Sequence, residues 1–280
     1  IYNDIKKTNN DIVMVVGPRN HIINKSSTIP LSGISNSKTI YCNDNGYYSI
    51  YQSDRYGFNN PDEEWDKKEI EYLLVGDSFT HGACVNRPND IGSVLRKNSN
   101  NSVLNLGQGG NGPLLAYATL REYLKANVKK VIWLYYEGND LVDYSFIEKK
   151  NNILNKYLKD LNFTQNLKFR QSIIDNLSIK IIEEKEKEIE IERERERERE
   201  KNTYKFNLIK FIKISNTRFL ILKSPTHTPA PTPEFKKILR LTKELMNKNN
   251  SKLYFVYLPQ YTRYKDNFDN TSYNLVKNIV

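Results

Sequence analysis

Three residues in the middle of the chain have the chemistry to act together on an acyl group. Ser78 carries a hydroxyl that can act as a nucleophile if a base and an oxyanion pocket converge on it. Gly110 has no Cβ, so its backbone amide can approach a ligand closely, and Asn139 offers a neutral side-chain amide. Amide donors aimed at one point stabilise a developing oxyanion, and losing one donor costs roughly a hundredfold in rate.

Each of these residues follows an apolar run that is typical of a buried strand. The runs cover residues 72–75, 102–106 and 130–136, and helices are expected near 89–97 and after Pro113. This alternation predicts a parallel α/β sheet with right-handed crossovers. Ligands bind beyond the carboxyl ends of parallel strands, so we expect all three residues on one rim of the sheet.

Three motifs occur in order: Gly76-Asp77-Ser78, Gly110 in a glycine-rich turn, and Gly138-Asn139-Asp140. Together they resemble the first three sequence blocks of the SGNH (GDSL-type) hydrolase family. The resemblance implies a three-layer α/β/α sandwich with a parallel, flavodoxin-like sheet. It also implies a hydrolase that cleaves ester bonds, or an acyltransferase that moves the acyl group to another hydroxyl.

The same resemblance assigns roles to individual residues. Ser78 matches the nucleophile of the family, and Gly110 and Asn139 match its oxyanion donors. Asp77, His81, Gly138 and Asp140 would line or support the pocket, and neither a metal nor an organic cofactor is required.

The fourth block of the family, Asp-x-x-His, does not occur in these 280 residues. We expect it beyond Val280 with one more strand, so the domain is predicted to be incomplete at its C-terminus and this piece to be inactive alone. His81 is close to Ser78 in the sequence, but its ring would have to turn back onto its own loop. A lining or packing role is therefore favoured for His81, while His21 and His227 have no evident partner.

The regions around the motifs define the expected domain organisation. Residues 1–68 are predicted to be a β-rich segment, either a cap or part of a preceding domain. A strand is expected at 11–16 and a hairpin around Asn45-Gly46, because both turn residues tolerate positive φ. Residues 69–280 are assigned to the hydrolase-like domain, with an insertion at 150–228.

The insertion interrupts the alternation of predicted strands and helices. Residues 153–182 are expected to be helical, and 183–201 form a low-complexity charged stretch for which a solvated helix or disorder is favoured over a partner-binding arm. Residues 224–231 are expected to form an extended linker. The alternation then resumes with a helix from Thr232, a strand at 253–258 and a last helix from about Asn270.

Two other functions compete with the ester hydrolase. Residues 107–112 fit the Gly-x-Gly-x-x-Gly pattern of a dinucleotide site, with Glu137 as the ribose-binding acid. That interpretation is weakened by Pro113, which suggests that the helix begins after the glycines. The other alternative is an inactive SGNH-like domain that binds carbohydrate or acts as a scaffold. An ordinary α/β-hydrolase is disfavoured because Thr80 replaces the second glycine of its nucleophile motif.

Composition limits the choice of partners. The net charge of +10 favours acidic surfaces or polymers, but no nucleic-acid motif is present. The expected substrate is a small-molecule or glycan ester, with the cell envelope as a hypothetical location, and membrane association would require a segment before Ile1. Cys42 and Cys84 are too few for a disulfide framework and lack the spacing of metal ligands, so the sequence is compatible with two free thiols and leaves the redox compartment open.

Overall fold

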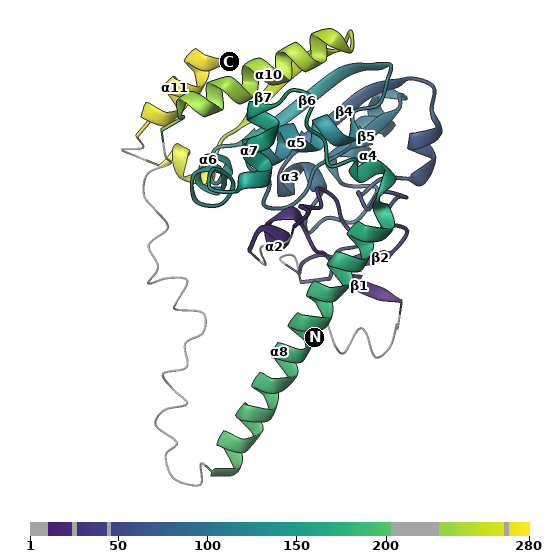
Figure 1. The fold of residues 1–280 in the computed structure, drawn as a ribbon, viewed down its shortest axis with the longest axis vertical. Coiled ribbons are helices and arrows are strands. Elements are labelled where there is room, and N and C mark those ends of the chain that lie inside the picture. Colours follow the sequence, from purple (N-terminus) through teal and green to yellow (C-terminus); the bar gives the residue numbers. More distant parts are fainter. Residues whose placement is uncertain (1–10, 24–26, 44–45, 203–229, 266–268) are drawn as a thin grey trace.

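The chain is described by a computed structural model that covers residues 11–23, 27–43, 46–202, 230–265 and 269–280. Its centre is a four-stranded parallel sheet in the order β5-β4-β6-β7 (Figure 1). The strands are β4 (Ile70–Gly76), β5 (Val103–Asn105), β6 (Val128–Tyr136) and β7 (Lys252–Leu258). This result confirms the predicted parallel α/β sheet. In chain order the strands lie 2-1-3-4, as in doubly wound sheets.

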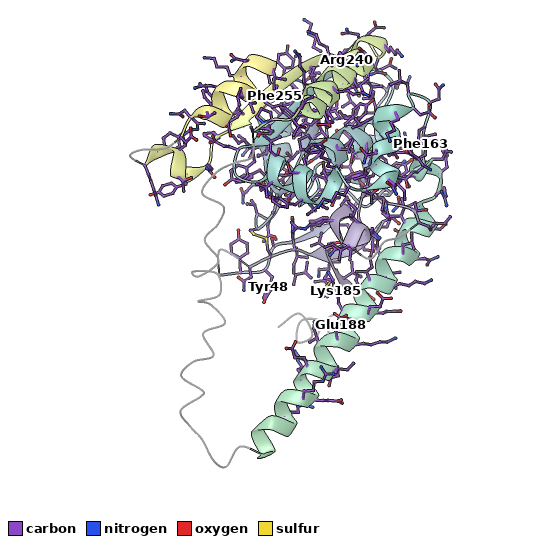
Figure 2. All side chains as sticks on the ribbon, turned by 60° about the vertical axis from the view of Figure 1, so that its left-hand side comes forward. Tyr48, Phe163, Lys185, Glu188, Arg240 and Phe255 are labelled. Atoms are coloured by element: carbon purple, nitrogen blue, oxygen red, sulfur yellow. A yellow bond between two sulfur atoms is a disulfide. The ribbon has the colours of Figure 1, made fainter. Side chains whose placement is uncertain are left out.

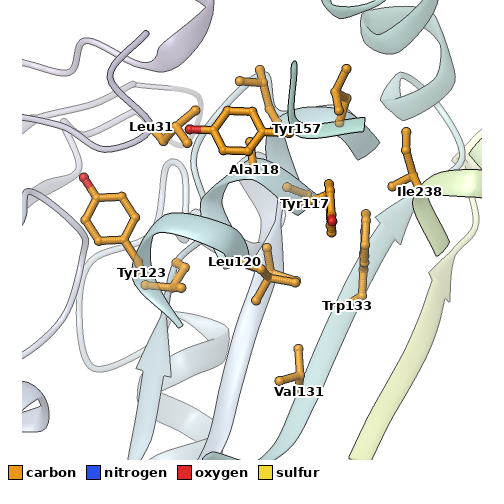
Figure 3. Packing of buried hydrophobic residues seen from close by; sticks show 14 of the residues in the cluster. Leu31, Tyr117, Ala118, Leu120, Tyr123, Val131, Trp133, Tyr157 and Ile238 are labelled. Atoms are coloured by element: carbon orange, nitrogen blue, oxygen red, sulfur yellow. The ribbon is translucent and has the colours of Figure 1, made fainter. Parts of the chain in front are cut away.

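Helices lie against both faces of this sheet because its strands are apolar on both sides. On one face, α5 (Pro113–Tyr123) and α10 (Pro233–Lys248) enclose the main core with residues from β4, β6 and β7. Figure 3 shows Tyr117 and Leu120 of α5 close to Val131 and Trp133 of β6. On the other face, α4 (Ile91–Ser99) packs near β5. The last helix, α11 (Thr271–Ile279), lies on the same face as α10, because its Val276 and Ile279 pack in the main core.

The described residues of the N-terminal segment, between 11 and 68, contain a second, smaller sheet. It contains β1 (Ile12–Met14), β2 (Lys38–Ile40) and β3 (Ile50–Gln52), and α2 (Pro18–Ile23) follows β1. Strands β2 and β3 are antiparallel, which confirms the predicted hairpin, although turn residues 44–45 lie outside the described residues. The strand expected at 11–16 is shorter than predicted and pairs in parallel with β2.

This N-terminal segment shares a core with the parallel sheet. Ile29, Leu31, Phe58 and Trp65 are buried in the same apolar cluster as α5. The buried carboxylate of Asp54 accepts hydrogen bonds from the amides of residues 56 and 58, from an Asn60 side-chain amide and from the Trp65 indole. The segment is therefore packed as a cap on the α/β body.

Cys42 and Cys84 form a disulfide and are not the two free thiols that the sequence also allowed (Figure 2). The two residues are 42 positions apart, and the pairing depends on tertiary structure. Cys42 follows β2 in the cap, whereas Cys84 lies three residues after the helix that begins at Ser78. The disulfide thus attaches the cap to the loop beside the candidate nucleophile.

The described part of the insertion, residues 150–202, is largely helical, as predicted for 153–182. It contains α7 (Asn152–Lys159), a 3-10 turn (Leu167–Phe169) and the long α8 (Gln171–Asn202). The first part of α8 packs on the cap through Ile181 and Ile182, and its charged second part projects from the body (Figures 1 and 2). The charged stretch is therefore a solvated helix, whereas His227 and nearly all of the expected linker at 224–231 lie outside the described residues.

Among the residues that the structure describes, no helix is both long enough and apolar enough to cross a bilayer.

Candidate functional site

Ser78 is the first residue of a short helix, α3 (Ser78–His81), directly after β4. Asp77 caps this helix: its carboxylate accepts from the amide of Phe79 at 3.0 Å. The Ser78 hydroxyl donates to the second Asp77 oxygen at 3.3 Å and remains only half-buried. The candidate nucleophile is therefore accessible, and Asp77 has the structural role expected for it.

The loop after β5 reaches the same edge of the sheet. The amide of Gln108 donates to the carbonyl of Gly76 at 3.2 Å, which aligns the glycine-rich turn with the end of β4. Gly110 has φ +78°, a conformation that favours glycine. Among the described residues, its amide has no hydrogen-bond partner. A free amide donor at this position is what an oxyanion site requires.

Asn139 lies at the third strand end, just before α6 (Asp140–Asp143). Its side-chain nitrogen donates to Asp143 at 3.0 Å, and its side-chain oxygen is buried without a partner among the described residues. Asp140 is buried, and its carboxylate accepts from the amide of Tyr136 at 3.1 Å, which closes the turn. A Cβ at Gly138 would stand 2.5 Å from the ring of Tyr136, so a side chain at this position would require that ring to move.

The cap contributes residues to this edge of the sheet, where α2, α3 and α6 gather (Figure 1). Arg19 of α2 donates to Asp143 at 3.2 Å, and its Cδ lies 3.4 Å from where a Cβ of Gly110 would stand. The side chain of Arg19 is 49% exposed. Tyr41 packs on Gly109 and on the ring of His81, with ring centroids 4.6 Å apart.

Three carboxyl groups, those of Asp77, Asp140 and Asp143, lie at this site, and burial favours the neutral form of each. Burial raises the pKa of Asp77, and it raises the pKa of Asp140 well above its usual range. Burial also raises the pKa of Asp143 to about 6, although the nearby charge of Arg19 opposes the shift. The charge of Asp77 adds to the shifts at both other carboxyls. The loops of Ser78 and Asn139 are therefore close enough to interact electrostatically.

His81 is fully buried beneath the site and has a packing role. One ring nitrogen accepts from the amide of Gly109 at 3.2 Å, and the other lies 2.9 Å from the Tyr51 hydroxyl. Burial lowers the pKa of His81 to about 3. Both nitrogens are engaged away from Ser78, so the ring is not positioned as a general base.

The ring of His21 also forms its contact away from Ser78. It is buried 3.2 Å from the Ser178 hydroxyl of α8, and burial lowers its pKa to about 4. Within the described part of the chain, no histidine is therefore placed to activate Ser78. In the same residues, no group of three or more His, Cys, Asp or Glu side chains could hold a metal ion.

Two buried carboxylates are relevant to the alternative of a dinucleotide site. Glu148, in a π-helical turn (Tyr144–Glu148), accepts from the amides of Gly112 at 2.6 Å and Leu114 at 2.8 Å. It therefore covers the N-terminus of α5, where a pyrophosphate would bind. Glu137 accepts from the amide of Gln260 and from the guanidinium of Arg263.

Sequence reasoning missed Arg19, Tyr41 and Asp143 as parts of this site. The spacing of Asn139 and Asp143 was an available signal, because residues four apart lie on one helix face. The sequence contains no such signal for Arg19 and Tyr41, because the residues that they contact are far away along the chain. No protein-family model matches this chain, and no curated protein shows significant similarity to it.

Proposed function

We propose that this protein is an SGNH-type serine ester hydrolase or O-acyltransferase. The observation that carries the proposal is the convergence of three loops at the carboxyl ends of β4, β5 and β6. They hold an accessible serine hydroxyl, the free amide of Gly110 and the side-chain amide of Asn139. Loops on both sides of β4 meet at the point where the strand order reverses, which is where ligands bind in such sheets.

In the proposed reaction, a general base takes the proton of the Ser78 hydroxyl as its oxygen attacks the ester carbonyl carbon. The resulting oxyanion accepts hydrogen bonds from the amide of Gly110 and the side chain of Asn139. The C–O bond to the alcohol then breaks, and the alcohol leaves with the proton. Water or an acceptor hydroxyl attacks the acyl-enzyme in the same way and restores Ser78. From the resemblance to the family, we expect this base to be the histidine of an Asp-x-x-His block.

The proposed substrate class rests on the composition of the chain and on its disulfide. The net charge of +10 and the 19 tyrosines suit an acyl-decorated glycan. The Cys42–Cys84 disulfide supports a location in the cell envelope or outside the cytoplasm, because disulfides persist in oxidising compartments. Release of acetate from O-acetylated polysaccharides would test this choice, and the absence of release from any of them would remove its main support.

A non-catalytic, glycan-binding domain is the second candidate. It is favoured by one observation: the described histidines, His21 and His81, are both buried and engaged elsewhere. A dinucleotide-binding function is disfavoured because Glu148 already uses the amides at the N-terminus of α5.

A fluorophosphonate probe, which labels activated serines, separates these candidates. The natural full-length protein should be labelled, and Ser78→Ala should abolish the labelling. Ser99→Ala is the matched control, because the Ser99 hydroxyl only donates to the carbonyl of Leu95 within α4. A folded wild-type protein that is not labelled would contradict the hydrolase proposal and favour glycan binding.

A further inference from the structure

We propose that Arg19 and Asp143 are positioning residues that fix the orientation of the Asn139 amide in the oxyanion site. This inference adds a detail to the proposed function, and its consequence for catalysis rests on that function. It gives the N-terminal cap a role in the site. Arg19 of the cap donates a hydrogen bond to Asp143, and Asp143 also accepts one from the side chain of Asn139.

The side-chain amide of asparagine can adopt two orientations with almost the same shape. An asparagine has a donor end and an acceptor end of nearly the same shape, so a half-turn exchanges the two. An ionised carboxylate only accepts hydrogen bonds. Asp143, 3.0 Å from the side-chain nitrogen of Asn139, therefore holds the donor end toward itself and repels the acceptor end. The nitrogen keeps a second N–H for the oxyanion.

No other contact holds the Asn139 amide in this orientation. Its oxygen is buried without a partner among the described residues, and its side chain does not cap α6. The carboxylate of Asp143 is thus the group that favours one orientation of the Asn139 amide over the other. Protonation of Asp143 would remove that distinction, because a carboxylic acid can donate to the amide oxygen as well as accept from the nitrogen.

The ionisation of Asp143 depends on the charges that face it. Burial and the charge of Asp77, at the end of β4, favour the protonated form. Asp140 of α6 and Glu148 of the π-helical turn are also affected by the charge of Asp143, so they lie near it. Among the groups that affect Asp143, Arg19 is the one with a positive charge, 3.2 Å away. Arg19 is therefore needed to keep Asp143 ionised near neutral pH.

The test follows the side-chain amide of Asn139 by NMR in folded protein with ¹⁵N-labelled asparagine. The signal pair is assigned by its loss in Asn139→Ser. In the wild type it should titrate with a midpoint of about 6, the pKa of Asp143. In Arg19→Ala the midpoint should rise by about one unit, since an opposite charge at this range lowers a carboxyl pKa by at least that much. Asp143→Asn should abolish the titration.

Arg55→Ala is the matched control, because Arg55 pairs with Asp62 and Asp66 in the cap. It should leave the Asn139 titration unchanged. An Asn139 signal that does not titrate, or that titrates identically in Arg19→Ala, would overturn the inference. This readout needs no catalysis, so its failure is distinguishable from failure of the proposed function.

A double-mutant cycle on the rate of fluorophosphonate labelling tests the catalytic consequence. We expect Asp143→Ala to slow labelling by about 10- to 100-fold, as loss or misplacement of an oxyanion donor does. If Arg19 acts through Asp143, adding Arg19→Ala to Asp143→Ala should cause no further loss. Fully additive losses would show that Arg19 acts independently and would overturn the chain of contacts.

Discussion

The carboxylate of Glu148 accepts a hydrogen bond from the amide of Gly112 at 2.6 Å, across 36 positions of the chain. It also accepts from Leu114, so α5 is capped by a residue from a later element. Burial raises the pKa of Glu148 to about 8, although these hydrogen bonds favour the charged form. The turn that carries Gly110 is thus held by a buried carboxyl that titrates near neutral pH.

We predict that Glu148→Gln destabilises the fold by about 1–3 kcal/mol, because one amide of the α5 N-terminus loses its acceptor. The pKa of Glu148 is higher in the folded state than in the unfolded state. Its contribution is therefore full below about pH 4.5 and is lost as the pH rises through about 8. Urea unfolding of both proteins from pH 4.5 to 8 should show a difference that shrinks with rising pH. A constant difference would contradict the assignment.

Gly76→Ala should destabilise the protein by about 3 kcal/mol or more. Gly76 has φ +152°, and a Cβ there would stand 2.4 Å from the carbonyl oxygen of Leu134 on the neighbouring strand. Overpacking adds to the backbone strain, because the strand cannot move away without breaking the sheet. The comparison is made by urea unfolding.

Gly46→Ala is the control for this prediction. Gly46 also has positive φ, +80°, but nothing lies within 4 Å of its Cβ position. It should cost only about 1–2 kcal/mol, the backbone penalty alone. Equal losses in the two variants would mean that the space around Gly76 is not limiting.

Removal of the disulfide should loosen the cap from the nucleophile loop. The loop closed by Cys42 and Cys84 spans 42 positions, for which chain entropy predicts about 4 kcal/mol of stabilisation. Cys42→Ser/Cys84→Ser should therefore have a lower Tm than the wild type under oxidising conditions. A reductant should lower the Tm of the wild type toward that of the variant and leave the variant unchanged. A wild type that is insensitive to reductant would contradict this.

His81→Phe should destabilise the protein by about 2–4 kcal/mol, because the Tyr51 hydroxyl and the Gly109 amide both lose a buried partner. The folded-state pKa of His81 is lowered to about 3, so its contribution is full above about pH 6.5 and is lost as the pH falls toward 3. Urea unfolding at pH 7.5 and pH 5 should show the larger difference at pH 7.5. Normal stability with loss of Ser78 labelling would instead identify His81 as the base.

The strand segments and the helix faces could be predicted from the sequence because their signals are local. The apolar run before Gly76 is long enough for a buried strand, and its register places Leu73, Leu74 and Val75 in the interior. In α10, Phe235 and Ile238 recur at helical spacing and are buried as expected. Such patterns need no knowledge of distant residues.

The contacts that build the site's surroundings could not be predicted in this way. Arg19 and Asp143 are 124 positions apart, and the sequence around either residue does not indicate that it contacts the other. The same is true of the disulfide, since two cysteines 42 positions apart are as compatible with free thiols as with a bond. The proposed roles of Ser78, Gly110 and Asn139 remain predictions.

Local sequence patterns are sufficient to assign which segments become strands and helices and at which strand ends the polar residues lie. Periodicity and turn chemistry act within a few residues, so they can be read without coordinates. Only the tertiary structure decided that the cap packs on the glycine-rich turn, that His81 is engaged by Tyr51 and Gly109, and that Glu148 covers α5. Burial and charge at each of these positions depend on segments that meet only when the chain folds.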